Sequence, residues 1–244
     1  MFPGIGTVIN IATIVVGAGF GVLAGSRMPE KTRLLLMDVL GLTTLLGAAS
    51  ALASLWAHRY TSALPTGWSL LTVLAALLLG GFVGSLARIE DRLETFGENL
   101  RKKFRSSKES TFVEGFVAAS LLFAIGPLAI LGSISDGMST GIEQLLLKST
   151  LDFFAAMAFA ATLGWGVAAS AIPVGIYQAV WTLVGLVLGT VLSGYQIDAM
   201  TVTGGLMLVC IGLRLLRIKE IAVGNLLPAL AFAPVIAWAM HQFV

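Results

Sequence analysis

The feature that most constrains this chain is a series of long apolar runs separated by short polar loops. A helix needs about 20 apolar residues to cross the hydrocarbon core of a bilayer. Lipid offers no hydrogen bonds to backbone groups, so a crossing segment must be a helix or a strand of a closed barrel. The runs are too long and too uniformly apolar for barrel strands. We therefore expect eight spanning helices, at residues 4–25, 34–56, 68–87, 115–134, 145–169, 172–194, 199–213 and 221–243.

The composition excludes a water-soluble globular domain. Of the 244 residues, 57% are hydrophobic and 11% are charged, whereas a soluble domain is about 25% charged. The expected fold is an all-α, polytopic transmembrane helix bundle forming one domain over residues 1–244, with the lipid bilayer as its partner. The single cysteine, Cys210, excludes an internal disulfide. The first run is too long for a signal-peptide core and is expected to be a retained helix.

Basic residues in the short loops predict the orientation, because cytoplasmic loops carry an excess of Lys and Arg. The opposite loops hold little beyond Arg59. With eight spans, the three basic loops lie on one side, so both termini are expected outside the cytoplasm. Aromatic residues then fall near the outer interface, at Trp56, Tyr60, Trp68, Tyr195 and Trp238. The basic loops contain Arg27, Lys31 and Arg33, then Arg88, Arg92, Arg101, Lys102, Lys103, Arg105 and Lys108, then Arg214, Arg217 and Lys219.

The long polar segment 88–110 has the pattern of an amphipathic helix. Its apolar residues recur at spacings of three and four, at Ile89, Leu93, Phe96, Leu100 and Phe104. The basic residues of the same segment lie beside this stripe. Such a helix is expected to lie on the cytoplasmic leaflet, either as a surface anchor or with a regulatory role.

Short matches in the same order predict an internal repeat of residues 1–134 and 135–244. The segment Gly19-Phe20-Gly21-Val22 matches Gly164-Trp165-Gly166-Val167, and Arg88-Ile89-Glu90 matches Arg217-Ile218-Lys219. Pro127 and Pro234 fall within the fourth and eighth runs. We expect a parallel repeat of four plus four helices, related by an axis along the membrane normal. Prolines at matching places can mark a transporter site, or can simply shape the bundle.

Charged residues at membrane depth usually face a bundle interior or an aqueous cavity. The densest set is Asp136, Glu143, Lys148 and Asp152. Lys148 and Asp152 are four residues apart, so they can pair on one helical face. One helix over residues 141–171 would exceed the hydrocarbon core. Either that helix protrudes, or residues 133–141 form a re-entrant loop lining a cavity.

A candidate substrate or ion site combines these charges with neutral polar residues of the spans. Asp136, Lys148 and Asp152 would line the site, and Asn10, Gln178 and Asn225 would supply neutral ligands. The competing interpretation is that these residues only hold helices together. Signatures of enzymes, nucleotide cradles and metal-ligand spacings around His58 and His241 are missing. We therefore expect no enzymatic activity, no cofactor, no metal and no nucleic-acid partner.

Four motifs carry a resemblance to a known family. They are Gly6-Thr7-x-x-Asn10, Gly132-x-x-x-Asp136-Gly137-Met138, Lys148-Ser149-x-Leu151-Asp152-Phe153-Phe154 and Asn225-Leu226-Leu227-Pro228-Ala229. Together they resemble the YqgA-type family of bacterial inner-membrane proteins, over nearly the whole chain. The resemblance implies a location in the inner membrane. The family is described as membrane or transport proteins with no settled substrate, so the resemblance adds little on mechanism.

The sequence thus favours a secondary transporter or channel-like permease for a small solute or ion. Asp136 or Asp152 could carry a coupling proton, because burial raises the pKa of a carboxyl group. The alternative is a non-transporting scaffold or sensor, and a membrane enzyme acting on lipid is a weaker third. A hydrated cavity at Asp136 and Asp152 would favour transport, and a dry, fully paired bundle the scaffold. Gly-rich helix faces are compatible with a homodimer.

Overall fold

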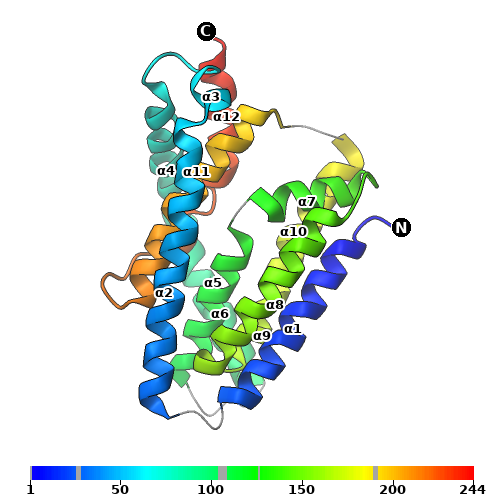
Figure 1. The fold of residues 1–244 in the computed structure, drawn as a ribbon, viewed down its shortest axis with the longest axis vertical. Helices are drawn as coiled ribbons and strands as arrows, with labels where there is room; N and C mark the ends of the chain where they lie inside the picture. Colours follow the sequence, from blue (N-terminus) through cyan, green and yellow to red (C-terminus); the bar gives the residue numbers. More distant parts are fainter. Residues whose placement is uncertain (1, 26–28, 104–108, 126, 189–191) are drawn as a thin grey trace. The chain divides into compact units, whose positions relative to one another are not determined.

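The computed structural model describes residues 2–25, 29–103, 109–125, 127–188 and 192–244, and every regular element within these ranges is a helix (Figure 1). The all-α prediction is confirmed. The elements are α1 (Ile5–Gly25), α2 (Glu30–Leu52), η1 (Ala53–Trp56), α3 (His58–Thr61), α4 (Trp68–Leu86), α5 (Ile89–Lys103), α6 (Glu109–Ala124), α7 (Pro127–Gly137), α8 (Glu143–Leu163), α9 (Gly166–Ala169), α10 (Ala171–Leu188), α11 (Gly194–Leu215), η2 (Val223–Leu226) and α12 (Ala229–His241).

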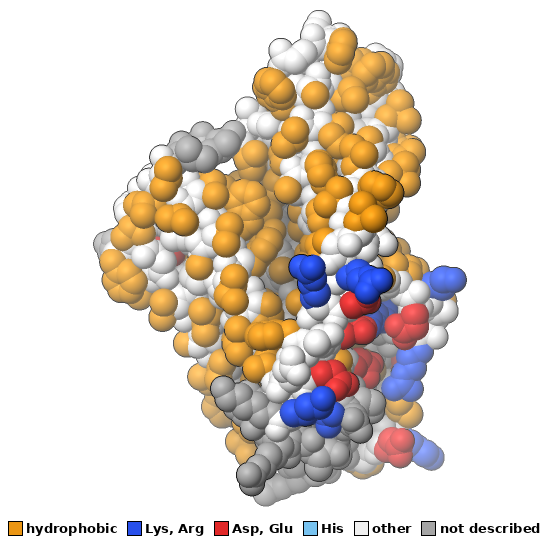
Figure 2. Space-filling model, turned by 180° about the vertical axis from the view of Figure 1, so that it is seen from behind, with side chains coloured by type: hydrophobic (Ala, Val, Ile, Leu, Met, Phe, Trp, Pro, Cys, Tyr) orange, Lys and Arg blue, Asp and Glu red, His pale blue; other side chains and the backbone are white. Residues whose placement is uncertain are grey.

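Length and apolar character identify the membrane-spanning elements. The described residues contain seven helical segments able to cross a membrane, or eight if the bent pair α6–α7 counts as one span. Helix α10 has an apolar side that is available to lipid. Ile176, Val180 and Leu183 lie on this side and are more than half exposed. Hydrophobic side chains predominate on the face drawn in Figure 2, and Lys, Arg, Asp and Glu side chains gather in one area of it. The protein is therefore a membrane protein with several transmembrane helices.

Several expected helix boundaries are wrong. The expected span 115–134 is divided, and its parts, Thr111–Ala124 and Leu128–Gly137, are bent by 63°. A proline has no backbone N–H for an intrahelical hydrogen bond, which explains a break at Pro127. The expected span 145–169 ends early, because α8 stops at Leu163 and Gly164 has a left-handed φ of 77°. The last expected span is present as the candidate span Val223–His241, which begins as the 3-10 helix η2 and continues as α12 after Pro228, the N-cap of α12.

The helix boundaries also test the two expectations for the polar segment 133–141 and the helix that follows it. A single protruding helix over residues 141–171 is wrong, since α8 begins at Glu143 and ends at Leu163. Residues 133–137 belong to α7, and only residues 138–142 connect it to α8. The polar segment is therefore mostly helical. The bent α6–α7 pair has the geometry of a broken span or of a re-entrant segment.

The chain forms two compact units. Unit 1 contains Met1–Leu40, Leu93–Ala124 and Leu128–Val191, and unit 2 contains Gly41–Arg92, Ile125–Pro127 and Leu192–Val244. Each unit draws helices from both halves of the sequence. The matched ends of α4 and α11 share one local feature, since Arg88 and Arg217 have positive φ angles of 50° and 56°. The repeat of residues 1–134 and 135–244 stays a prediction.

Unit 1 is organised by the close packing of α1 on α8, which lie side by side in Figure 1. Gly17, Gly21 and Gly25 are placed against the backbone of α8 at Phe153, Met157 and Ala161, respectively. Both numberings rise together, so the two helices are parallel. Small residues allow helix backbones to approach closely in a membrane. This contact fixes the register in which polar residues of α1 meet those of α8.

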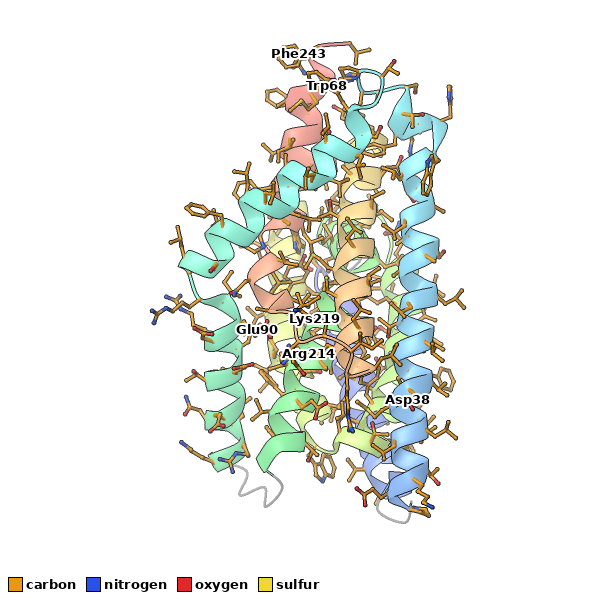
Figure 3. All side chains as sticks on the ribbon, turned by 90° about the vertical axis from the view of Figure 1, so that its left-hand side faces the viewer. Asp38, Trp68, Glu90, Arg214, Lys219 and Phe243 are labelled. Carbon is orange, nitrogen blue, oxygen red and sulfur yellow. The ribbon has the colours of Figure 1, made fainter. Side chains whose placement is uncertain are left out.

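In unit 2, α4 packs antiparallel to α12. Gly80 and Gly84 of α4 lie against Ala229 and Asn225, and the rings of Trp68 and Phe243 are 6.1 Å apart at the other end (Figure 3).

Tyr60, one of the aromatic residues expected near the outer interface, is covered by other parts of the protein, and its depth in the membrane stays a prediction. Tyr60 is fully buried, and its hydroxyl donates to the Ser69 carbonyl at 3.0 Å. Trp56 and Trp238, by contrast, are exposed.

The amphipathic segment is helical as α5, from Ile89 to Lys103. Its apolar side is partly covered within unit 1, where the ring of Phe96 lies 5.9 Å from the ring of Phe116 of α6. Its location on the cytoplasmic leaflet stays a prediction. Arg27, Phe104, Arg105 and Lys108 lie outside the described residues.

The α1–α8 contact predicts opposite effects for two glycines of one helix. A methyl group at Gly21 would collide with the Met157 carbonyl oxygen, whereas nothing lies within 4 Å of one at Gly19. We expect Gly21→Ala to destabilise the protein by about 1–3 kcal/mol. Gly19→Ala should be neutral or stabilising by up to about 1 kcal/mol. Melting temperatures in detergent measure both, and equal effects would contradict the packing.

The fold also predicts the topology. In unit 2 the basic ends of α4 and α11 meet, since Glu90 of α5 contacts Arg214. In unit 1 the end of α1 lies against Ala161, and the start of α6 lies against Leu163. If α6–α7 counts as one span, the chain has eight spans and both termini lie on the same side of the membrane. We then expect a reporter fused after Val244 to be external, and a cysteine at exposed Lys102 to be labelled from the cytoplasm. A cytoplasmic Val244 would instead require a model in which α6–α7 does not cross.

Candidate functional site

The buried charges of unit 1 begin with an ion pair on α8. The Nζ atom of Lys148 lies 2.5 Å from Oδ2 of Asp152, as the spacing of four residues predicts. Both side chains are buried, with 8% and 9% of their surfaces exposed. Ser149, on the same helical face, is buried as well. A charged pair at this depth must be satisfied by the protein, or by water or a ligand.

Helix α1 supplies the next polar group. The Nδ2 atom of Asn10 donates to Oδ2 of Asp152 at 3.0 Å, and Asn10 is fully buried. One carboxylate oxygen thus accepts from both Lys148 and Asn10. The predicted association of Asn10, Lys148 and Asp152 is present in the structure.

The register of α10 against α1 places Gln178 at the level of Asn10. The hydroxyls of Thr7 and Thr182 lie 3.5 Å apart, and Gly175 is placed against Ile11. The two helices are therefore antiparallel. Gly175, Gln178 and Thr182 share one face of α10, since their spacing is three and then four residues. Gln178, which is fully buried, consequently lies on α10 at the level of Asn10.

Asp136 of α7 occupies an adjacent level of the cluster. Its Oδ2 atom accepts a hydrogen bond from the backbone N–H of Gly6 at 3.0 Å, and the side chain is buried. Gly6 lies in the first turn of α1, where backbone N–H groups have no partner within the helix. A carboxylate is stabilised there by the helix dipole. Gly6 and Asn10 are four residues apart, so the two carboxylates are separated by about 6 Å along α1.

Several buried atoms of this cluster have no hydrogen-bond partner among the described residues. They are Oδ1 of Asn10, Oγ of Ser149, and both Oε1 and Nε2 of Gln178. Buried polar atoms are paired in the great majority of cases, and each unpaired one costs about 1–3 kcal/mol. These atoms are therefore left for water or a ligand to complete.

The cluster carries a net negative formal charge. Among the described side chains of unit 1, the buried charged residues are Asp136, Asp152 and Lys148. Two carboxylates and one ammonium give one unit of negative charge. Glu143, which the sequence placed in the same charged set, is exposed at the start of α8 and lies outside the buried cluster.

Asn225, another predicted site residue, is located in unit 2 rather than in this cluster. Its Oδ1 atom accepts a hydrogen bond from the backbone N–H of Glu90 at 3.0 Å. Five of the six predicted site residues, namely Asn10, Asp136, Lys148, Asp152 and Gln178, therefore lie in unit 1, where Asn10, Lys148 and Asp152 are joined by hydrogen bonds, and Asn225 lies in unit 2.

Sequence reasoning missed a second buried ion pair, in unit 2. Glu90 is buried and lies 2.5 Å from Nη1 of Arg214 (Figure 3). Its other carboxylate oxygen accepts from the backbone N–H of Gly224 at 2.5 Å. Glu90 and Arg214 are 124 positions apart in the sequence. Each lies at the polar end of its helix, which is the pattern of an interfacial charge. The pair connects α5 to α11 and η2. The Glu90 carboxylate and the Arg214 guanidinium each have a partner in this contact.

The described residues offer no conventional metal centre, since no group of three or more His, Cys, Asp or Glu side chains could hold a metal ion. His241 lies at the end of α12, with Nδ1 2.7 Å from the Ala63 carbonyl oxygen.

The unpartnered atoms of the cluster predict modest effects of single charge removals, because a water or ligand that completes these atoms would also solvate the charge left behind. We expect Lys148→Met and Asp152→Asn each to lower the melting temperature only slightly. A dry, isolated pair would instead cost about 3–5 kcal/mol in each single variant, largely recovered in the double variant. Thermal melting in detergent distinguishes the two, with Glu143→Gln on the same helix as the exposed control. Strong losses rescued by the double change would indicate a purely structural pair.

Comparisons with known proteins identify the family of this chain. A family model described as "Protein of unknown function (DUF554)" matches residues 5–238. The chain is 31% identical over 233 residues to "Uncharacterized protein YqgA" of Escherichia coli (strain K12), covering 94% of each chain. It is 29% identical over 238 residues to "Uncharacterized membrane protein YdfK" of Bacillus subtilis (strain 168), covering 98% of this chain and 97% of the relative. No solved structure matches. The chain, a multi-helix membrane protein with a buried polar cluster, belongs to the DUF554 family.

Proposed function

We propose that this protein is a secondary transporter or permease that moves a small solute or ion across a bacterial inner membrane. The observation that carries the proposal is the buried cluster of Asn10, Lys148, Asp152 and Gln178, in which several polar atoms have no protein partner. Charges and amides at membrane depth are costly, and they typically mark substrate or ion routes. The cluster lies where α1 packs against both α8 and α10, with α7 adjoining through Asp136.

The bent α6–α7 pair adds to this proposal. Its second part carries Asp136, and the bend of 63° directs that part away from the axis of α6. Broken helices at membrane depth are tolerated where they are buried in protein or line a water-filled cavity. A residue carried by such a segment can change its environment when the segment moves. Asp136 is therefore a candidate for a residue that lines the route.

The competing function is a non-transporting scaffold or sensor. The observations in its favour are the pairs that are satisfied, Lys148 with Asp152, Asn10 with Asp152, and Asp136 with Gly6. A scaffold explains these three contacts. It gives no reason for a fully buried glutamine, Gln178, with neither amide atom paired. The transport function therefore accounts for more of the cluster. No enzymatic role is proposed.

Flux measurements in vesicles test the transport function. Purified protein would be reconstituted into liposomes loaded with a pH-sensitive dye, and Na⁺, K⁺ and Li⁺ gradients imposed in turn. Light scattering would follow the entry of neutral probes such as glycerol and urea. We expect flux of at least one probe above protein-free liposomes. This flux should fall at least tenfold in Asp152→Asn and persist in Glu143→Gln, because only the first residue lies in the buried cluster.

Absence of flux for every probe with the wild-type protein would favour the scaffold. Equal flux in wild type and Asp152→Asn would show that the cluster does not line the route.

A further inference from the structure

Helix α7 lies at the end of unit 1 where α1 begins (Figure 1). A Cβ atom at Gly132 would meet the side chain of Leu145, near the start of α8. One turn further along α7, Asp136 accepts its hydrogen bond from the backbone N–H of Gly6. Gly6 is itself placed against both Leu145 and Asp136. The first turns of α1 and α8 therefore meet beneath α7.

Helix α7 also packs on the last part of α10. A Cβ atom at Gly137 would meet the carbonyl oxygen of Thr182, and one at Gly185 would meet the carbonyl oxygen of Ile134. One numbering rises as the other falls, so the two helices are antiparallel and their backbones are in contact. Helix α7 thus contacts three helices of unit 1, which are α1, α8 and α10.

These contacts lie one turn from the buried polar cluster on each helix. The contacted residue and its neighbour in the cluster are Gly6 and Asn10 on α1, Leu145 and Lys148 on α8, and Thr182 and Gln178 on α10. Each pair is three or four residues apart, about 5 Å along its helix. Because α1 and α8 are parallel and α10 is antiparallel to α1, the three contacts lie at the same end of the cluster. Helix α7 therefore covers this end.

The opposite end of the cluster is closed differently between α1 and α8. There, Gly17 is placed against the backbone of Phe153, and the backbone contact continues as far as Gly25. Ile14, which lies between Asn10 and Gly17, is fully buried. Separating these backbones would break the main packing contact of the unit. Access to the cluster between α1 and α8 is therefore more easily opened at the end that α7 covers.

The construction of α7 allows it to move as a separate piece. It is 11 residues long and is bent by 63° from α6, so no continuous helix fixes its position. At Gly132 and Gly137 it inserts no side chain between the other helices. The buried hydroxyl of Ser133 donates to the Ala129 carbonyl of the same helix at 2.6 Å. Asp136, by contrast, supplies a side-chain hydrogen bond from α7 to another helix.

We propose that α7 is a gate over the buried cluster, and that the hydrogen bond from Gly6 to Asp136 holds the gate closed. Opening breaks this bond and moves α7 away from the first turns of α1 and α8. The face of α8 that carries Lys148 and Asp152 then becomes accessible. Asp136 is a positioning residue in this proposal, because it acts through α7. The inference rests on the proposed transport function, and it names how access to that site is regulated.

The reactivity of a buried thiol tests the gate without a transport measurement. Ser149 is buried one turn beyond Leu145 on α8, so Ser149→Cys reports access beneath α7, in a background where Cys210→Ala removes the native cysteine. Purified, full-length protein in detergent would be treated with a water-soluble, positively charged methanethiosulfonate. Mass spectrometry would follow the labelling. A buried thiol reacts through the open form, so its rate measures the opening equilibrium.

Variants of α7 identify the bond that holds the gate. Asp136→Ala removes the acceptor for the Gly6 N–H, and we expect labelling of the Ser149→Cys protein to become about tenfold faster. Asp136→Asn keeps an oxygen that accepts from Gly6, so its rate should stay close to that of the parent. Ser133→Ala is the matched control on the same helix, because the Ser133 hydroxyl bonds within α7, and it should leave the rate unchanged.

The native cysteine distinguishes opening of the gate from general loosening. Cys210 lies on α11 in unit 2 and is partly buried. In protein that keeps Ser149, Asp136→Ala should leave the labelling rate of Cys210 unchanged. Equal acceleration at both thiols would overturn the gate, as would an unchanged rate for the Ser149→Cys protein carrying Asp136→Ala.

A reversible disulfide tests whether α7 must move during flux. A Cβ atom at Gly132 would lie 3.2 Å from the backbone nitrogen of Leu145, so Gly132→Cys with Leu145→Cys places two thiols within reach of a disulfide. In the liposome assay with the same ion gradients and neutral probes, oxidation should stop flux and dithiothreitol should restore it. The control pair, Thr7→Cys with Thr182→Cys, joins α1 to α10 where the two hydroxyls are 3.5 Å apart. It leaves α7 free, so flux should persist after oxidation.

The two assays separate the gate from transport itself. Flux that survives oxidation of the pair at Gly132 and Leu145 would overturn the gate and leave transport standing. Faster labelling in Asp136→Ala, with no flux of any probe through the wild-type protein, would support the gate and contradict transport.

Discussion

The parallel contact between α1 and α8 is the interaction on which the rest of unit 1 depends. Gly17, Gly21 and Gly25 let the backbone of α1 approach that of α8, which no larger side chain would allow. This approach sets Asn10 within hydrogen-bond distance of Asp152. The hydrophobic effect does not drive helix association within lipid, so close packing and polar contacts must do so. The glycines therefore both stabilise the unit and create the place where its charges meet.

What could be predicted from the sequence follows from the range of the interactions involved. Apolar runs identified the spanning helices, and a spacing of four residues identified the Lys148–Asp152 pair, because both are local properties. The cost of polar groups in lipid correctly singled out Asn10, Asp136 and Gln178 as buried. Long-range contacts were not accessible in the same way. Asn225 bonds to Glu90, 135 positions away, rather than to the charged cluster.

Helix interruptions were the other limit. Pro127 could be flagged because a proline lacks the N–H that a helix requires, but the sequence could not give the bend of 63° between α6 and α7. The end of α8 at Gly164 was missed, because many glycines in membrane helices serve packing and only some adopt a positive φ. Gly19 and Gly164 occupy matching positions of the two sequence segments, yet Gly19 lies inside helix α1 while Gly164 has a φ of 77°.

The two interpretations of the buried cluster differ in what they require of Gln178. In a scaffold, leucine at this position would fill similar space and avoid two unpaired polar atoms, each costing about 1–3 kcal/mol. Such a cost is large beside a typical total stability of about 5–15 kcal/mol. Asn10 is different, because its Nδ2 atom already holds Asp152 and a structural role suffices for it. A fully buried amide with neither atom paired is accounted for by a ligand or water that completes it. Gln178 is therefore stronger evidence for function than the Lys148–Asp152 ion pair, which either interpretation explains.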